Sequence, residues 1–390
     1  MIGGAFVAVL VFEVALKVVE VSPLWRVLPL VEPILGEPDA RMGYAFTPGA
    51  EGIWIEENRA RIRINALGLR DAEREIEKKS GTFRVGLVGD SMVEALQVDQ
   101  SQTFSAIAER DLKSKGVNAE VVNLAMAGMG PLRQLVRMEA SGYPLNLDLA
   151  VFVLNVNDFL TSDMTDDSAF TAYRRGADGY LSRSERFRER RSVRLRNTVF
   201  GRTFVWSYQN SAVFRLLYQR LRRPWRSVLN LPAPPPARVA QTDACFNDAL
   251  DAQFALWTQQ QPASAWAVTA HFLDDAQRSL DAAGVPTVVM IRALWLPPLV
   301  CAEARERRAA TLAAIQTSLS AHGFGSLDIN TEVDQALGLP DGGSDAHGPL
   351  HGFGVRRGRG HLNLLGHQTY AQILEAVVAA RIPASAMFRY

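Results

Sequence analysis

From Phe83 onward, short apolar runs rich in β-branched residues alternate with longer stretches of helical periodicity. The runs cover Phe83–Val88, Glu120–Leu124, Leu149–Leu154, Pro286–Ile291 and, more weakly, Phe324–Ile329. The helical patterns cover Thr103–Lys113, Leu132–Ala140, Ala267–Ala283 and Ala304–Ala321, and a last one follows Gly366. Strand and helix in alternation indicate a parallel sheet with crossover helices on both faces. The sequence therefore predicts an α/β fold, a flavodoxin-like doubly wound sheet of about five strands.

The spacing of these runs also divides the chain. More than a hundred residues separate the third and fourth strands, far longer than an ordinary crossover. Ahead of the sheet, short alternation around Ile62 and Ile64 predicts a β-hairpin. We therefore expect an apolar N-terminal helix at 1–22, an extension with a hairpin at 23–80, the first part of the α/β domain at 81–158, an insertion at 159–262 and the second part at 263–390.

Composition excludes several classes of protein. With 390 residues, 48% of them hydrophobic and 21% charged, the chain can bury a full core and is not a disordered polymer. Its two cysteines, Cys245 and Cys301, are too few for a disulfide scaffold. They form a single bridge if the protein is exported, or are two unrelated thiols.

The N-terminal stretch IGGAFVAVLVFEVALKVVEV is apolar except for Glu13 and Lys17, which stand four residues apart and can pair on one helix face. About 20 apolar residues span a bilayer, and no small-x-small cleavage site follows. The stretch predicts an uncleaved membrane anchor, with the main domain on the exported, periplasmic or extracellular side. The alternative is a helix buried on the protein's own surface.

A basic block lies inside the insertion. Between Thr171 and Ser227 there are fifteen arginines, no lysine and three acidic residues, although the whole chain carries a net charge of only +1. Such a block suggests an anionic neighbour, a phospholipid surface or an acidic glycan. Its arginines interleave with apolar residues in NSAVFRLLYQRLRRPWRSVLN, which fits either a membrane interface or a helix packed on the core. Without a zinc-finger or RNA-recognition signature, nucleic acid is not an expected partner.

Four polar signals fall where strands end or the last helix begins. Ser91 follows the first strand, Gly128 lies in a glycine-bearing loop after the second, Asn157 follows the third, and His361 precedes the last helix. The carboxyl ends of parallel strands meet at one edge, where α/β proteins bind ligands. Ser91 alone is as well explained by helix capping. Together the four predict acyl transfer, with Ser91 as nucleophile, His361 as base and then acid, and the Ser91 and Gly128 N–H groups with the Asn157 side chain holding the oxyanion.

This arrangement resembles the SGNH (GDSL-like) hydrolase superfamily. The matching residues are GDS at 89–91, Gly128 five positions after Asn123, Asn157-Asp158, and His361 in HLN, and the segment Ile64–Asp71 resembles a branch that has an N-terminal membrane anchor. The resemblance implies hydrolysis of an ester, an acyl group on a glycan or lipid. The same residues serve an O-acyltransferase when a sugar hydroxyl replaces water.

The sequence departs from the family pattern at two places. Asn155 stands where the family usually has glycine, and Gly358 and Arg359 stand where an aspartate usually precedes the histidine. Asp345 or Asp341 is then the candidate triad acid, unless a Ser–His dyad operates. The third possibility is that catalysis is lost and the chain is a structural subunit of a membrane assembly.

The histidines near the C-terminus do not predict a metal site. His347, His351, His361 and His367 lie near acidic residues, but their spacing matches no metal-binding pattern, so neither a metal nor a cofactor is predicted. We expect His367 to be structural. Asp90 and Asp158 are expected to hold loops by accepting backbone N–H bonds rather than to react.

Overall fold

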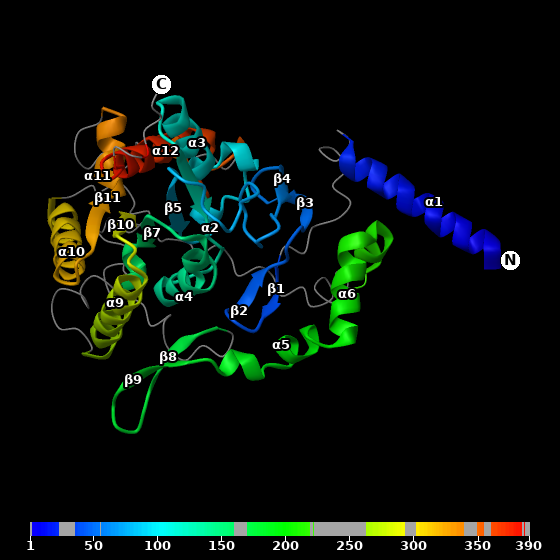
Figure 1. The fold of residues 1–390 in the computed structure, drawn as a ribbon, viewed down its shortest axis with the longest axis horizontal. Coiled ribbons are helices and arrows are strands. Elements are labelled where there is room, and N and C mark those ends of the chain that lie inside the picture. The colour runs from blue at the N-terminus through cyan, green and yellow to red at the C-terminus, as the bar shows by residue number, and fades with distance from the viewer. Residues whose placement is uncertain are drawn as a thin grey trace.

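The centre of the molecule is a five-stranded parallel sheet (Figure 1). The computed structural model describes residues 2–22, 36–54, 56–159, 170–218, 221, 263–292, 302–338, 349–354, 360–383 and 386. The strands are β5 (Phe83–Val88), β6 (Ala119–Asn123), β7 (Leu149–Asn155), β10 (Thr287–Arg292) and β11 (Gly325–Asp328), in the spatial order β11-β10-β7-β5-β6. Counted from β5, this is the order 2-1-3-4-5 of flavodoxin-like sheets. The predicted α/β sheet is confirmed.

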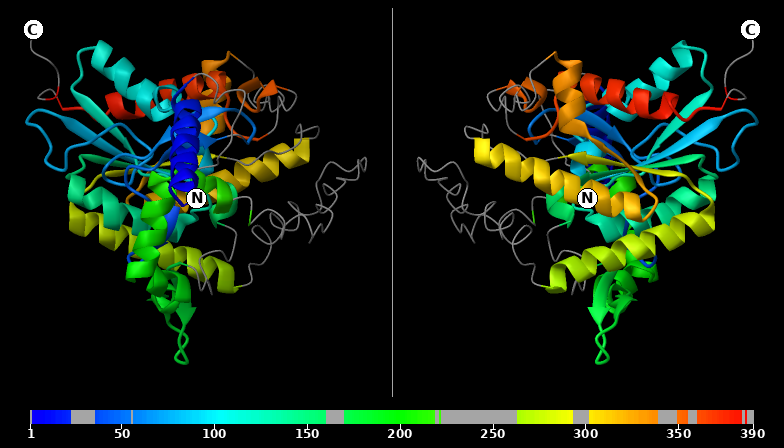
Figure 2. Two further views of the ribbon diagram at one scale, coloured as in Figure 1. Left: turned by 90° about the vertical axis from the view of Figure 1, so that its right-hand side faces the viewer. Right: turned by 90° about the vertical axis from the view of Figure 1, so that its left-hand side faces the viewer.

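Helices cover both faces of this sheet (Figure 2). On one face lie α4 (Pro131–Arg137), α9 (Ala263–Ala283) and α10 (Ala302–Ala321); on the other lie α3 (Phe104–Ser114), α11 (Ile329–Ala336) and α12 (Leu364–Ala379). Along β7, Phe152 packs into the first layer and Val151 and Val153 into the second. Because both faces are covered, the strands are continuous apolar runs.

The extension ahead of the sheet contains two antiparallel ribbons, β1 (Gly36–Asp39) with β2 (Gly43–Phe46) and β3 (Glu51–Trp54) with β4 (Ala60–Arg63). The β3–β4 pair is the predicted hairpin. The segment after it turns around Asn65, whose side-chain oxygen accepts hydrogen bonds from the Leu67 and Leu69 backbone N–H groups. Arg74 then pairs with Asp71 at 2.8 Å and Glu109 at 2.7 Å, which ties the extension to α3.

The N-terminal helix α1 (Ile2–Val21) extends from the body of the molecule (Figure 1). Glu13 accepts hydrogen bonds from the Ser211 hydroxyl and from the backbone N–H groups of Ala212 and Val213. Burial alone would raise the pKa of Glu13, but these bonds and Lys17 lower it to about 2. A charged side chain of α1 therefore joins the insertion by capping the helical residues 212–218.

The prediction of a membrane anchor at 1–22 is not supported. Across the described residues, no helix combines the length and the apolarity needed to cross a membrane. Glu13 and Lys17, paired at 3.2 Å, interrupt the apolar sequence of α1. Much of its apolar surface stays open to solvent, with Val7 58% and Phe12 49% exposed.

The described part of the insertion contains β8 (Ala172–Arg175), β9 (Leu181–Ser184), α5 (Arg191–Arg196) and α6 (Val199–Asn210). Some arginines of the basic block form internal ion pairs. Arg183 pairs with Glu139 at 2.7 Å and with Asp275 at 2.6 Å. Part of the block therefore fastens the insertion to the sheet domain. Cys245 and Cys301 lie outside the described residues.

Candidate active site

Ser91 lies at the turn between β5 and the short helix α2 (Ser91–Glu94). Asp90 caps this helix by accepting a hydrogen bond from the Met92 N–H at 2.9 Å. The turn is tight, because a Cβ on Gly89 would lie 2.2 Å from Cγ2 of Val93. Ser91 is partly exposed while the rest of α2 is buried. The sequence GDS thus presents a serine at the carboxyl end of a central strand.

The loop that carries Gly128 is joined to the Ser91 turn at two points. The Met126 N–H donates to the Gly89 carbonyl at 3.3 Å, and the Ala127 N–H donates to Oε2 of Glu94 at 3.0 Å. Gly128 has a φ of +72°, and a Cβ there would meet nothing within 4 Å. A ligand can therefore approach the backbone at this glycine closely. Burial raises the pKa of Glu94 to about 8.

The end of β7 is joined to the same turn through Asp90. The Asn155 side-chain Nδ2 donates to Oδ2 of Asp90 at 2.9 Å, and Nε of Arg292 donates to the Asn155 side-chain oxygen Oδ1 at 2.8 Å. Asp158 accepts from the Asn155 backbone N–H at 2.7 Å. Asp90 and Asp158 therefore hold loops, as predicted, and Asn155 makes contacts that a glycine cannot. Asn157 lies in the 3₁₀ turn after β7, but its side chain is outside the described residues.

His361 lies just before α12, and its loop is held by a backbone bridge between His351 and Leu362. Its ring Nδ1 is 2.8 Å from Oε1 of Glu57, and its backbone N–H donates to Oε2 of Glu57 at 2.9 Å. With Nδ1–H donating to the carboxylate, Nε2 becomes the basic nitrogen. Glu57 thus supplies the orienting carboxylate that the residues before His361 do not provide.

Glu57 comes from the β3–β4 connection, 304 positions before His361 in the sequence. The next residue, Asn58, donates from Nδ2 to the Gln97 carbonyl at 2.7 Å, and the Arg61 N–H donates to Asp99 at 2.9 Å. Ile62 shares an apolar cluster with Leu96, Met126 and Met129. The hairpin therefore packs on the segment after α2 and on the Gly128 loop, which are two parts of the same site.

Glu57 was not predicted from the sequence, because the expected acid was one close to His361 along the chain. The predicted alternatives, Asp341 and Asp345, lie outside the described residues, as do Gly358, Arg359 and His347. One feature of the sequence is consistent with the contact. Gly360 has a φ of +90°, and a Cβ there would lie 2.7 Å from Oε2 of Glu57.

The structure gathers the loops of Ser91, Gly128 and β7 by direct hydrogen bonds, and it joins His361 to Glu57. Both groups border one apolar cluster, which contains Met92 and Val93 of α2 and Leu362 next to His361. Among the described residues, no hydrogen bond links the Ser91 hydroxyl to His361. Catalytic hydrogen bonds are often long without substrate and shorten when it binds.

Two further histidines have structural positions. His367 is buried and its Nδ1 accepts from the Phe104 N–H at 3.3 Å. Burial lowers the pKa of His367 to about 3, so the ring stays neutral, in line with the predicted structural role. Nδ1 of His351 lies 3.0 Å from the Gly360 carbonyl oxygen. Within the part of the chain that the structure describes, no group of three or more acidic, histidine or cysteine side chains is arranged to hold a metal ion.

No protein-family model and no curated protein matches the chain. Among solved structures it is similar to LAE5, an α/β hydrolase from the metagenome of Lake Arreo in Spain, at 12% identity over 77% of this chain and 97% of that one, with a TM-score of 0.38. A lipase/acylhydrolase from Enterococcus faecalis gives 10% identity, 77% and 97% coverage and a TM-score of 0.37. The acetyl xylan esterase AlAXEase gives 12% identity over 76% of this chain and 100% of that one, with a TM-score of 0.35. At these TM-scores and identities, the similarities do not establish a family.

Proposed function

We propose that the chain is a serine esterase of the SGNH type that cleaves an acyl ester of a glycan or lipid with a Ser91–His361–Glu57 triad. The observation that carries the proposal is the pair of contacts from the Glu57 carboxylate to His361, at 2.8 Å to Nδ1 and 2.9 Å from the backbone N–H. A carboxylate on Nδ1 fixes the tautomer that leaves Nε2 free to accept a proton and stabilises the imidazolium that forms.

In the proposed mechanism, Nε2 of His361 takes the Ser91 hydroxyl proton while the serine oxygen attacks the ester carbonyl. The negative charge on the carbonyl oxygen is held by the Ser91 and Gly128 N–H groups and the Asn157 side chain. His361 then returns the proton to the leaving alcohol, and an acyl-enzyme remains. Water, deprotonated by His361, attacks the acyl carbon. His361 then returns the proton to the Ser91 oxygen as the acyl bond breaks, which releases the carboxylic acid and restores the serine hydroxyl.

The main reason to consider an inactive scaffold is the absence of an aspartate just before His361. A carboxylate contributed by the hairpin removes that reason. Glu57 and His361 are separately anchored, Glu57 by the Asn58 and Arg61 contacts and the His361 loop by the bridge between His351 and Leu362. Positioned groups of this kind are what nucleophilic catalysis requires.

The proposal is tested by intact-mass labelling of the full chain with a fluorophosphonate probe, which reacts only with an activated serine. Wild-type protein should gain one adduct, and Ser91→Ala and His361→Ala should gain none. Ser101→Ala, at an exposed serine ten residues away, is the matched control and should label like the wild type. The proposal fails if folded wild-type protein does not label, or if Ser91→Ala labels to the same extent as the wild type.

A further inference from the structure

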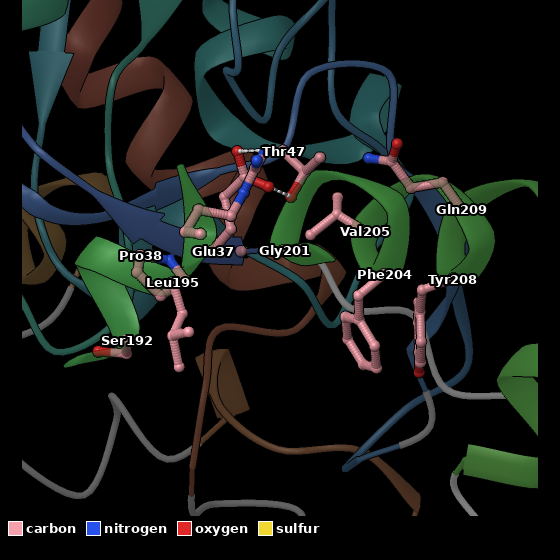
Figure 3. A pocket seen from close by; sticks show the side chains of 12 residues that line it. Glu37, Pro38, Thr47, Ser192, Leu195, Gly201, Phe204, Val205, Tyr208 and Gln209 are labelled. Carbon is pink, nitrogen blue, oxygen red and sulfur yellow. Dashed lines mark hydrogen bonds and ion pairs between the residues drawn. The ribbon is translucent and has the colours of Figure 1, made fainter. Parts of the chain in front are cut away.

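A separate pocket lies between the β1–β2 ribbon and helices α5 and α6 (Figure 3). Its volume is about 310 Å³, at the small end of the range for small-molecule sites. It is lined by residues that include Glu37, Leu195, Arg196, Phe204, Val205 and Tyr208. None of its lining residues belongs to the candidate active site, so any ligand here is distinct from a substrate bound at Ser91.

The charged groups of the pocket neutralise one another. Oε1 of Glu37 lies 2.6 Å from Nη2 of Arg196, and Oε2 of Glu37 accepts a hydrogen bond from the Thr47 hydroxyl at 3.2 Å. Figure 3 shows Glu37 and Thr47 gathered on one side, with Phe204 and Tyr208 at a distance from them. The remaining walls offer an occupant mainly apolar contact, apart from Nε of Arg196 and Nε2 of Gln209, which are buried donors without a hydrogen-bond partner among the described residues. The interior therefore suits a hydrocarbon chain.

Two exposed arginines of α5 adjoin lining residues of the pocket along the chain. Leu195 lines the pocket and is 59% exposed, so the cavity opens to solvent along α5. Arg191 and Arg194 directly precede the lining residues Ser192 and Leu195, and both are exposed. No ion pair joins either guanidinium to a carboxylate in the described ranges. Guanidinium groups bind carboxylates by paired hydrogen bonds, so the mouth suits an anionic head attached to an apolar chain.

We propose that this pocket binds a fatty acid, with the acyl chain between α5, α6 and the β1–β2 ribbon and the carboxylate at Arg191 and Arg194. The exposed residues Val199, Phe200 and Trp206 on α6 make a lipid bilayer the competing occupant of this region. A single free chain is favoured because the cavity is small and because two exposed arginines adjoin its lining residues Ser192 and Leu195. The proposal does not depend on ester hydrolysis at Ser91.

The first test is calorimetric titration of the full chain with sodium decanoate below its micelle concentration. Val205→Trp places an indole in the cavity and should weaken binding about tenfold or more, because the chain loses its apolar contacts. Val199→Trp adds the same side chain to the same helix at a position that is 78% exposed, and should bind like the wild type. Fluorophosphonate labelling of Ser91 should be unchanged in both, which separates this proposal from the proposed function.

The second test concerns the head group. The double variant Arg191→Ala, Arg194→Ala should weaken decanoate binding about three- to tenfold, since exposed charge pairs are individually modest. Decanol should bind wild type more weakly than decanoate, and the double variant should remove that difference. A photoreactive diazirine fatty acid on wild-type protein should label peptides within 36–47 or 192–209, which requires no variant to fold.

The outcomes that overturn the proposal are specific. Equal decanoate affinity in wild type and Val205→Trp shows that the cavity is not used, and equal loss in Val199→Trp shows binding to the helix surface. Capture of the protein by anionic phosphatidylglycerol vesicles, with no decanoate binding, shows that this face meets a bilayer. Diazirine labelling spread over the whole chain shows adventitious adsorption only.

Discussion

The candidate site is built from two regions that differ in how they are held. The strand-end region, with Ser91, Gly128 and Asn155, lies at the carboxyl edge of the sheet and is fixed by hydrogen bonds between neighbouring loops. The β3–β4 hairpin brings Glu57 from outside the sheet and is held by the Asn58 and Arg61 contacts and a small apolar cluster. The first region follows from the architecture of a doubly wound sheet. The second depends on how an appended ribbon packs.

The largest effect is expected from Glu57→Gln. The amide keeps the shape but loses the charge that supports the imidazolium and can present the wrong hydrogen-bonding group to Nδ1. By comparison with the serine-protease triad, kcat should fall by about four orders of magnitude. Steady-state hydrolysis of p-nitrophenyl acetate measures kcat. Glu56→Gln, at the exposed neighbouring residue, should keep wild-type activity, and similar rates for the two variants contradict the triad.

The two regions of the site also differ in how far the sequence predicts them. The five strands and the places of Ser91, Gly128 and His361 follow from local apolar runs and from the rule that parallel strands end at one edge. Glu57 does not follow, because 304 residues separate it from His361 and no short-range pattern records a contact of that span. The hairpin itself was predictable from alternation at Ile62 and Ile64, whereas its docking on the Gly128 loop depends on tertiary packing.

The same limit applies at α1. Its apolar sequence predicted an anchor, and the capping of residues 212–218 by Glu13 was not foreseen. The pairing of Glu13 with Lys17 was predicted from their spacing. Residue spacing predicts a contact within about one helical turn, but a contact between α1 and the insertion depends on tertiary folding and has no local sequence pattern.

In the strand-end region, Glu94 should make stability depend on pH. Burial raises its folded pKa to about 8 from 4.5, so between those values the folded state binds a proton that the unfolded state has released. The contribution of Glu94 to the free energy of unfolding is therefore largest below pH 4.5. It decreases as pH rises towards 8, by several kcal/mol at most, at about 1.4 kcal/mol per pKa unit.

The glutamine of the variant Glu94→Gln cannot ionise. Its free energy of unfolding should therefore increase relative to that of the wild type as pH rises from 5 to 9. Urea unfolding at pH 5, 7 and 9 measures the difference. Glu56→Gln provides the comparison at an exposed carboxyl and should follow the wild-type curve. A difference between Glu94→Gln and wild type that stays constant over this range argues against a protonated Glu94.

A smaller effect is expected where the hairpin meets the His361 loop. Gly360→Ala puts a Cβ at 2.7 Å from Oε2 of Glu57 and should lower kcat by about ten- to a hundredfold by displacing the carboxylate. Gly354→Ala is matched, since Gly354 also has a positive φ, +56°, but a Cβ there meets nothing within 4 Å. Both variants lose about 1–2 kcal/mol of stability from the left-handed backbone, so equal kcat values for the two would show that contact with Glu57 is unimportant.

The smallest effect should come from the anchor of the hairpin rather than from Glu57 itself. Asn58→Ala removes the 2.7 Å hydrogen bond to the Gln97 carbonyl, which costs about 1 kcal/mol or slightly more. The carboxylate then samples more positions, so kcat should fall severalfold, up to about tenfold, while KM changes little because no substrate contact is lost. Arg59→Ala, at the exposed next residue, should leave both constants unchanged. If Asn58→Ala lowers Tm but not kcat, the Asn58 hydrogen bond is not needed to position Glu57, and the two regions of the site are less dependent on each other than their contacts indicate.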